Sequence, residues 1–286
     1  MNRPAALSLL NLACVLAAGF SSLIARAGAI PADTRTISGI AYYPAETPVV
    51  DPDRRCVLDI RHPADHPGFA TLVWFHGGGL TGGQREFPQF KGQGVALIAV
   101  GYRLSPQAQC PDFLKDAAAA TAWTVKNISR YGGDPKKVFI GGHSAGGYLV
   151  AMIGMDPKWL APYGLGPRSL AGILPVSAQV TTHFHVKELR AIPGPALLPV
   201  IDDFAPLHYV SEDLPPMCLI LGDRRIEFKC RVEENELLYA TLRNLGHPDV
   251  EFHEIKDLDH GTVVQGAATV MPGFIDRIGK SIDAAR

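Results

Sequence analysis

One stretch of sequence decides the fold of this chain: Val138-Phe139-Ile140-Gly141-Gly142-His143-Ser144-Ala145-Gly146-Gly147. Its first three residues are apolar and indicate a short buried strand, and residues 145–155 are compatible with a helix. Between them lies the pattern G-x-S-x-G. A strand, a sharp turn and a helix at this spacing hold the serine in strained backbone geometry and expose its hydroxyl above a sheet. Ser144 is therefore predicted to be a nucleophile.

The segments around this motif alternate between strands and helices. Strands are expected at residues 56–60, 71–75, 95–100, 171–176, 217–221 and 250–255. Helices are expected at residues 111–131, 145–155, 232–245 and 263–282. This order predicts an α/β fold, with a mostly parallel sheet covered by helices on both faces. Residues 177–215 contain several prolines and little periodicity, so we expect an insertion that forms a lid or pocket wall.

Composition favours one large domain and argues against nucleic acid as a partner. The chain has 286 residues, of which 47% are hydrophobic and 19% are charged. Its 27 basic and 28 acidic residues nearly balance, and no basic stripe is present.

The first 29 residues have the pattern of a signal peptide. A short positive start precedes an almost entirely apolar run over residues 5–24, and small-x-small cleavage sites follow at residues 25–29. We expect cleavage, export to the periplasm or outside the cell, and one catalytic domain over residues 30–286 with no stable membrane span. The alternative is an uncleaved membrane anchor, because the apolar run is nearly long enough to span a bilayer.

Four cysteines remain after that segment is removed: Cys56, Cys110, Cys218 and Cys230. An exported chain can oxidise them, and the three possible pairings all stay open. Their spacing lacks a C-x-x-C pair, so no zinc site is expected.

A glycine-rich loop supplies candidate oxyanion donors. His76-Gly77-Gly78-Gly79 directly follows the buried strand at residues 71–75. Three glycines allow the backbone to approach a substrate and to turn several N–H groups toward one point. Although a plain glycine turn is the alternative, the serine motif downstream favours an oxyanion hole built with the amide of Ala145.

The catalytic base and its acid are expected after the last strands. His260 follows the strand at residues 250–255 and precedes Gly261. The acid is expected after the strand at residues 217–221, where Asp223 is favoured and Glu227 is the alternative.

These motifs occur with several others in one order: Trp74-Phe75-His76-Gly77-Gly78-Gly79, Gly101-Tyr102-Arg103-Leu104-Ser105-Pro106, Tyr131-Gly132-Gly133-Asp134-Pro135, Gly141-Gly142-His143-Ser144-Ala145-Gly146-Gly147 and Leu258-Asp259-His260-Gly261. A chain with this series resembles bacterial esterases of the hormone-sensitive-lipase-like and feruloyl/acetyl-esterase-like branches of the α/β-hydrolase superfamily. The resemblance extends from about residue 57 to the C-terminus.

The resemblance implies that the amides of Gly78, Gly79 and Ala145 form the oxyanion hole. Related esterases carry their acid in a D-P-L-R-D-E-like run. Here the proline is absent and the run is shorter, so the register of Asp223 is not fixed.

The expected activity is hydrolysis of a carboxylic ester through an acyl-enzyme, on short-chain or carbohydrate-linked substrates. This chemistry requires no metal or organic cofactor. Two alternatives are an arylformamidase-like amide hydrolase and a catalytically inactive binding protein. The acyl and alcohol groups and the oligomeric state stay open.

Overall fold

The computed structural model describes residues 34–286. The predicted signal peptide, residues 1–29, lies outside the described residues and stays a prediction. Within residues 34–286, no helix is both long and apolar enough to cross a membrane.

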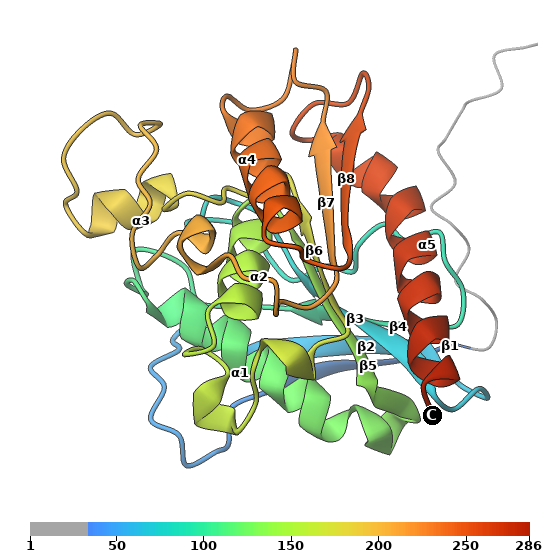
Figure 1. The fold of residues 1–286 in the computed structure, drawn as a ribbon. Coiled ribbons are helices and arrows are strands. Elements are labelled where there is room, and N and C mark those ends of the chain that lie inside the picture. The colour runs from blue at the N-terminus through green and yellow to red at the C-terminus, as the bar shows by residue number, and fades with distance from the viewer. Residues whose placement is uncertain (1–33) are drawn as a thin grey trace, which may run out of the picture.

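The centre of the structure is an eight-stranded sheet in the order β1-β2-β4-β3-β5-β6-β7-β8 (Figure 1). The strands are β1 (Thr34–Ala41), β2 (Val57–Pro63), β3 (Phe69–Phe75), β4 (Val95–Val100), β5 (Gly133–His143), β6 (Gly172–Val176), β7 (Met217–Gly222) and β8 (Val250–Ile255). β2 pairs antiparallel with β1 and β4, whereas neighbours from β4 to β8 run parallel. The predicted mostly parallel sheet is confirmed.

Edge strand β1 is absent from the sequence-based prediction, which assigned no strand before residue 56. Six of its eight residues are exposed, so the segment lacks the apolar alternation that marks a half-buried strand. Its pairing with β2 depends on backbone hydrogen bonds rather than on buried side chains.

Helices cover both faces of the sheet (Figure 1). They are α1 (Asp112–Asn127), α2 (Ala145–Met155), α3 (Phe184–Leu189), α4 (Arg231–Asn244) and α5 (Val263–Ala284). Along β3, Val73 and Phe75 belong to the core that includes α1, α2 and α4, whereas Leu72 and Trp74 belong to the core under α5. Each fully buried apolar side chain contributes roughly 1.5–3 kcal/mol of transfer free energy. The continuously apolar strands are therefore stabilised from both sides.

The predicted insertion, residues 177–215, is only partly irregular. It contains α3 and a short 3-10 helix at Pro206–Tyr209. The Tyr148 hydroxyl on α2 donates to the Phe204 carbonyl at 2.9 Å, and the Lys187 ammonium donates to the Leu198 carbonyl at 2.6 Å. These hydrogen bonds hold the insertion against α2 and stabilise its own loop.

Close backbone packing fixes the start of α2 against β3. A Cβ atom added to Gly146 would lie 2.0 Å from the Phe75 carbonyl oxygen, and one added to Gly142 would lie 2.5 Å from the Gly146 carbonyl. Only glycine allows this approach, which places the G-x-S-x-G turn directly beside the end of β3.

We expect Gly146→Ala to lower the free energy of unfolding by at least about 2 kcal/mol, because backbone atoms must shift to admit the methyl group. Gly273→Ala is the matched control. Gly273 is exposed on α5 and has open space around its Cβ position, so alanine should stabilise by about 0.5–1 kcal/mol. Urea unfolding of both variants tests this, and equal effects would contradict the packing argument.

Candidate active site

Four parallel strands deliver the candidate site residues to one edge of the sheet. The glycine loop follows β3, Ser144 follows β5, Glu227 lies five residues after β7, and His260 lies five residues after β8. Because the carboxyl ends of parallel strands lie at the same edge, segments that are far apart in sequence converge there.

Ser144 occupies the strained turn expected for a nucleophile. Its backbone has φ 54° and ψ −114°, and it forms the N-cap of α2. Such a conformation costs a non-glycine residue on the order of 1–3 kcal/mol. The Ser144 amide donates to the Val176 carbonyl of β6 at 2.8 Å, which anchors the turn to the neighbouring strand. The side-chain hydroxyl lies 2.9 Å from Nε2 of His260.

His260 connects this hydroxyl to a carboxylate. Its Nδ1 lies 2.7 Å from Oε1 of Glu227. Since an ionised carboxylate only accepts hydrogen bonds, the Nδ1–H donates to Glu227 and Nε2 is left to accept from the Ser144 hydroxyl. The Glu227 side chain is only 1% exposed, which shields this hydrogen bond from water.

Glu227 is held ionised by several donors. Its Oε2 accepts from the Ser177 hydroxyl at 2.5 Å and from the Gly222 amide at 2.9 Å, and its Oε1 accepts from the Phe228 amide at 2.7 Å. Burial by itself raises the pKa of this carboxyl. The hydrogen bonds from His260, Ser177 and Phe228 outweigh burial and lower the pKa from 4.5 to about 2.

The preference for Asp223 as the orienting acid is wrong, and the alternative Glu227 takes that position. The Asp223 carboxylate binds the Arg225 guanidinium and accepts from the Asp257 amide. These donors hold the pKa of Asp223 well below its usual range. Because the Asp223 amide also donates to the Leu258 carbonyl at 2.7 Å, this residue links the loops that carry Glu227 and His260.

A single helical turn explains the four-residue offset. The amide of Glu227 donates to the Asp223 carbonyl at 2.8 Å, so the chain curls back over the end of β7. The carboxylate then lies over Gly222, where an added Cβ would be 2.7 Å from Oε2 of Glu227. The shortened run after β7 was the one sequence signal for this change of register.

Two further residues position the site and were not predicted. Ser177 donates to Glu227 as described above. His143, inside G-x-S-x-G, has Nε2 2.7 Å from the His260 carbonyl oxygen. Burial, and then the nearby His260, lower the pKa of His143 from 6.5 to about 4, so its neutral imidazole donates Nε2–H to that carbonyl. A histidine between glycine and serine carries no sequence signal for this contact.

The glycine loop lies beside Ser144. A Cβ added to Gly77 would be 3.4 Å from the Cβ of Ser144. Gly78 and Gly79 both have positive φ, and within residues 34–286 the amides of Gly78, Gly79 and Ala145 have no hydrogen-bond acceptor. Unpaired amides next to a nucleophile are the arrangement that an oxyanion hole requires.

A family model described as alpha/beta hydrolase fold matches residues 72–264. The chain belongs to this α/β-hydrolase fold family. It is 25% identical over 214 residues to Esterase LipC of Mycobacterium tuberculosis, a match that covers 69% of this chain and 53% of that protein. The chain thus spans about half the length of this curated relative. The resemblance inferred from the motifs is confirmed at the level of the family.

Solved structures agree on the fold. Esterase B from Lactobacillus rhamnosis has a TM-score of 0.68 at 19% identity and covers 90% of this chain and 89% of its own. A truncated carbohydrate esterase from gut microbiota has a TM-score of 0.66 at 16% identity, with coverage of 86% and 96%. At these identities the similarity shows that the α/β-hydrolase fold is shared.

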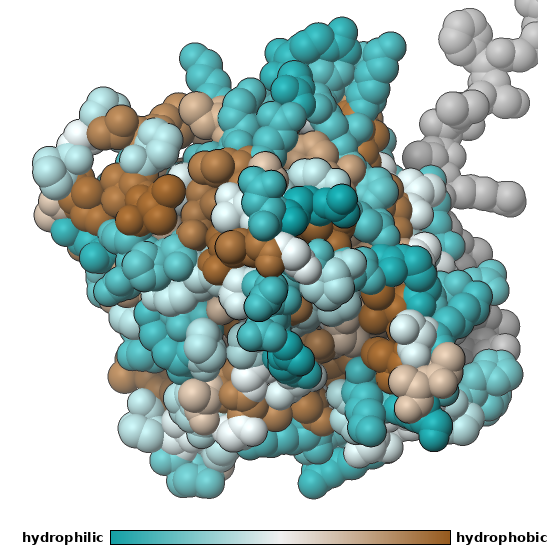
Figure 2. Space-filling view, in the orientation of Figure 1, coloured by the Kyte–Doolittle hydropathy of each residue, from teal (hydrophilic) through white to brown (hydrophobic). Residues whose placement is uncertain are grey.

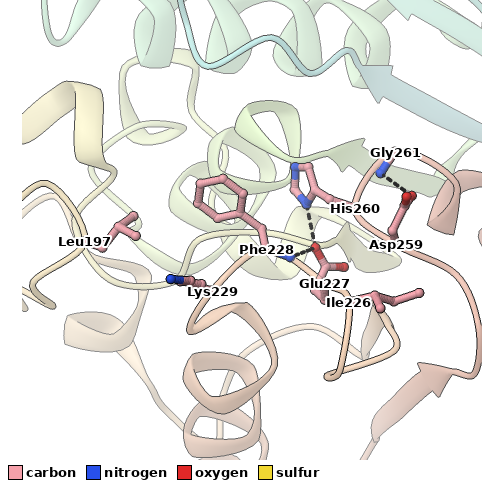
Figure 3. A pocket seen from close by; sticks show the side chains of 8 residues that line it. All are labelled: Leu197, Ile226, Glu227, Phe228, Lys229, Asp259, His260 and Gly261. Carbon is pink, nitrogen blue, oxygen red and sulfur yellow. Dashed lines mark hydrogen bonds and ion pairs between the residues drawn. The ribbon is translucent and has the colours of Figure 1, made fainter.

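A cavity of about 520 Å³ opens beside His260 in this α/β-hydrolase (Figure 3). The residues that line it are Leu197, Ile226, Glu227, Phe228, Lys229, Asp259, His260 and Gly261. Leu197 comes from the predicted insertion, so this segment contributes to the wall. The Asp259 carboxylate accepts from the amides of Gly261 and Thr262, which shapes the loop that carries His260.

The candidate site does not draw on the cysteines. Cys56, Cys110, Cys218 and Cys230 are all unpaired. Cys218, Glu251 and His253, on β7 and β8, place possible metal-ligand atoms within 4.8 Å of one another. Arg277 and His253 already bind Glu251, at 2.6 and 2.8 Å, and burial raises the pKa of the Cys218 thiol well above its usual value. A protonated thiol and an occupied carboxylate disfavour metal binding.

The buried His143 predicts a loss of stability in acid. Between pH 6.5 and 4 the unfolded chain protonates this imidazole and the folded chain does not, so the free energy of unfolding decreases as the pH decreases. The His143 contribution between pH 7 and pH 5 is on the order of 2 kcal/mol.

Urea unfolding of the wild-type and His143→Gln proteins at both pH values measures this contribution. Glutamine keeps a donor near the position of Nε2 but does not titrate, so the variant should lose less stability in acid. His66→Gln, at an exposed position, controls for the substitution. Equal losses in the wild-type and His143→Gln proteins would show that His143 does not resist protonation.

Proposed function

We propose that this chain is a serine hydrolase that cleaves carboxylic esters through an acyl-enzyme. The observation that supports this most directly is the continuous series of hydrogen bonds from the Ser144 hydroxyl to Nε2 of His260, at 2.9 Å, and from Nδ1 of His260 to Glu227, at 2.7 Å. A nucleophile, a base and an orienting acid within hydrogen-bond distance constitute the arrangement used for acyl transfer.

In the first step the Ser144 hydroxyl attacks the ester carbonyl while His260 accepts its proton. The imidazolium that forms is stabilised by Glu227, whose low pKa keeps it anionic beside the new cation. The tetrahedral oxyanion accepts hydrogen bonds from the amides of Gly78, Gly79 and Ala145. Proton transfer from His260 to the alcohol oxygen then releases the alcohol and leaves the acyl group on Ser144.

In the second step water attacks the acyl-enzyme. His260 accepts a proton from this water, the same amides stabilise the second oxyanion, and the carboxylic acid leaves as Ser144 regains its proton. A competent residue occupies each of these positions, which is why we favour an enzyme over an inactive binding protein.

The cavity favours small esters. Its volume of about 520 Å³ suits a small ligand, and Leu197, Ile226 and Phe228 present partly exposed apolar side chains to it. Further apolar surface gathers over the segment around α3 (Figure 2), where Leu198 and Ile201 are also exposed. We therefore propose short acyl chains as the groups that bind against these walls. The similarity to a carbohydrate esterase adds sugar-linked esters to the substrates that we propose.

We also propose that the chain is exported, on the basis of the apolar segment and small-residue cleavage sites within residues 1–29. Mass spectrometry of the protein recovered after expression with its native N-terminus tests this. A mature chain that begins near residue 30 is expected, whereas an intact N-terminus in a membrane fraction would favour an uncleaved anchor.

Ser144→Ala should reduce kcat for p-nitrophenyl acetate by about 10⁶-fold, because no other group at the site replaces the nucleophile. A fluorophosphonate probe should label the wild-type protein and not the variant. Retained turnover in Ser144→Ala would contradict the mechanism. Rates on p-nitrophenyl esters of graded length and on acetylated or feruloylated sugars then define the substrate class.

Glu227→Gln should reduce kcat by about 10⁴-fold, because the amide no longer favours the tautomer and the cation that His260 requires. Asp223→Asn is the matched control. It removes a carboxylate from the same turn but leaves the contact between Glu227 and His260, so kcat should change less than about tenfold. The opposite order of effects would assign the orienting role to Asp223.

A further inference from the structure

Arg231, the first residue of α4, is a buried cation without a salt-bridge partner among residues 34–286. The residue is only 4% exposed, and its Nε is enclosed without a hydrogen-bond acceptor. Within residues 34–286, no carboxylate lies within 4 Å of its guanidinium, and its terminal nitrogens have no acceptor either. Arg224 and Arg225, just before it in the chain, both form ion pairs with carboxylates.

The neighbouring carboxylates are already occupied. Glu234, one turn along α4, accepts from the amides of Val180 and Thr181 and from the Thr181 hydroxyl. Glu227 accepts four hydrogen bonds, as described above. The charges of Glu234 and Glu227 act on Arg231 from beyond salt-bridge distance, and the Phe228 ring, whose centroid lies 5.5 Å from the guanidinium carbon, adds a cation–π contact. An unpaired buried charge is costly, so this arrangement points to a function.

The guanidinium lies next to the candidate active site. The same Phe228 ring lies 5.5 Å from the His260 ring, and Figure 3 shows Phe228 beside His260 on the cavity wall. Burial is the main cause that lowers the pKa values of His143 and His183, and the positive charge of Arg231 also lowers both. Nε is fully enclosed but the two terminal nitrogens are not, and Arg231 adjoins the cavity through its contact with Phe228, a residue of the cavity wall.

A second cation lines the cavity itself. Lys229 is exposed on its wall (Figure 3) and has no carboxylate within 4 Å in the described part of the chain. The two carboxylates on the wall are both engaged, because Glu227 binds His260 and Asp259 binds Gly261 and Thr262. The unpaired charge at the cavity is therefore positive.

We propose that Arg231 binds a carboxylate that the ester substrate carries on its acyl or alcohol part, and that Lys229 assists. This inference rests on the proposed esterase function and narrows its substrate class to esters with one free acid group. A planar guanidinium suits a carboxylate, because two N–H groups can donate to its two oxygens.

Two pairs of matched esters test the proposal and separate the two sources of the carboxylate. For the acyl part, ethyl hydrogen succinate is compared with ethyl 4-methylpentanoate. For the alcohol part, carboxymethyl butanoate is compared with 2-methylpropyl butanoate. Each pair differs by a carboxylate in place of an isopropyl group. In at least one pair the wild-type kcat/KM should favour the acid by about tenfold or more.

Arg231→Met should abolish that preference, through both KM and kcat, so that the acid and the neutral ester of each pair have similar kcat/KM. Arg231→Lys should retain part of the preference. Arg224→Met is the matched control, because that arginine is exposed and already ion-pairs with Glu236 and Glu254. Absence of a preference in both wild-type pairs, or a preference that persists in Arg231→Met, would overturn the proposal.

Binding measurements keep this test independent of turnover. By calorimetry, Ser144→Ala should bind ethyl hydrogen succinate or carboxymethyl butanoate at least about tenfold more tightly than the neutral analogue. Ser144→Ala/Arg231→Lys should bind the same acid more weakly than Ser144→Ala does. Equal affinities would reject the role of Arg231 even if Arg231→Met fails to fold. Failure of the esterase function itself would appear differently, as absence of turnover on every ester, including p-nitrophenyl acetate.

Discussion

The buried carboxylate of Glu227 is the contact on which the geometry of the site depends. Its donors come from three strand ends: Ser177 follows β6, Gly222 ends β7, and His260 follows β8. A carboxylate that is 1% exposed requires such donors, because without them burial would neutralise it. The same hydrogen bonds that keep Glu227 ionised therefore hold three loops in register and orient the imidazole.

The half of the site that holds Ser144 and the glycine loop depends on a steric constraint. The approach of Gly146 to the Phe75 carbonyl places the start of α2 against β3, and this packing carries Ser144 and the glycine loop together. His143 joins the two halves, because it precedes Ser144 and donates to the His260 carbonyl. The distance between the hydroxyl and the imidazole is thus set by backbone contacts on both sides, which limits the reorganisation that the reaction needs.

The sequence predicted those features that depend on local pattern. Apolar runs identified the parallel strands, and G-x-S-x-G together with His76-Gly77-Gly78-Gly79 located the candidate nucleophile Ser144 and the adjacent amides. Edge strand β1 was missed because an exposed strand does not require apolar residues. The preference between Asp223 and Glu227 was wrong because a single helical turn after β7, closed by a 2.8 Å backbone hydrogen bond, reverses which side chain faces His260. That turn depends on tertiary structure, and the spacing in the sequence was compatible with either carboxylate.

Arg231 illustrates a further limit of sequence patterns, since an arginine at the start of a helix ordinarily indicates a solvated surface position. Its burial follows from the α4 face that it shares with Glu234 and Asn235, both of which bind the segment after β6. The charge has consequences for the proposed reaction, because proton transfer to His260 creates a second cation near an unpaired guanidinium. Glu227 offsets the charge on the imidazolium but is not within salt-bridge distance of Arg231. A substrate carboxylate at Arg231 would remove this repulsion, so the group that selects the substrate would also favour the transition state. A uniform gain in binding would not have that effect, because only interactions that strengthen as charge develops raise kcat.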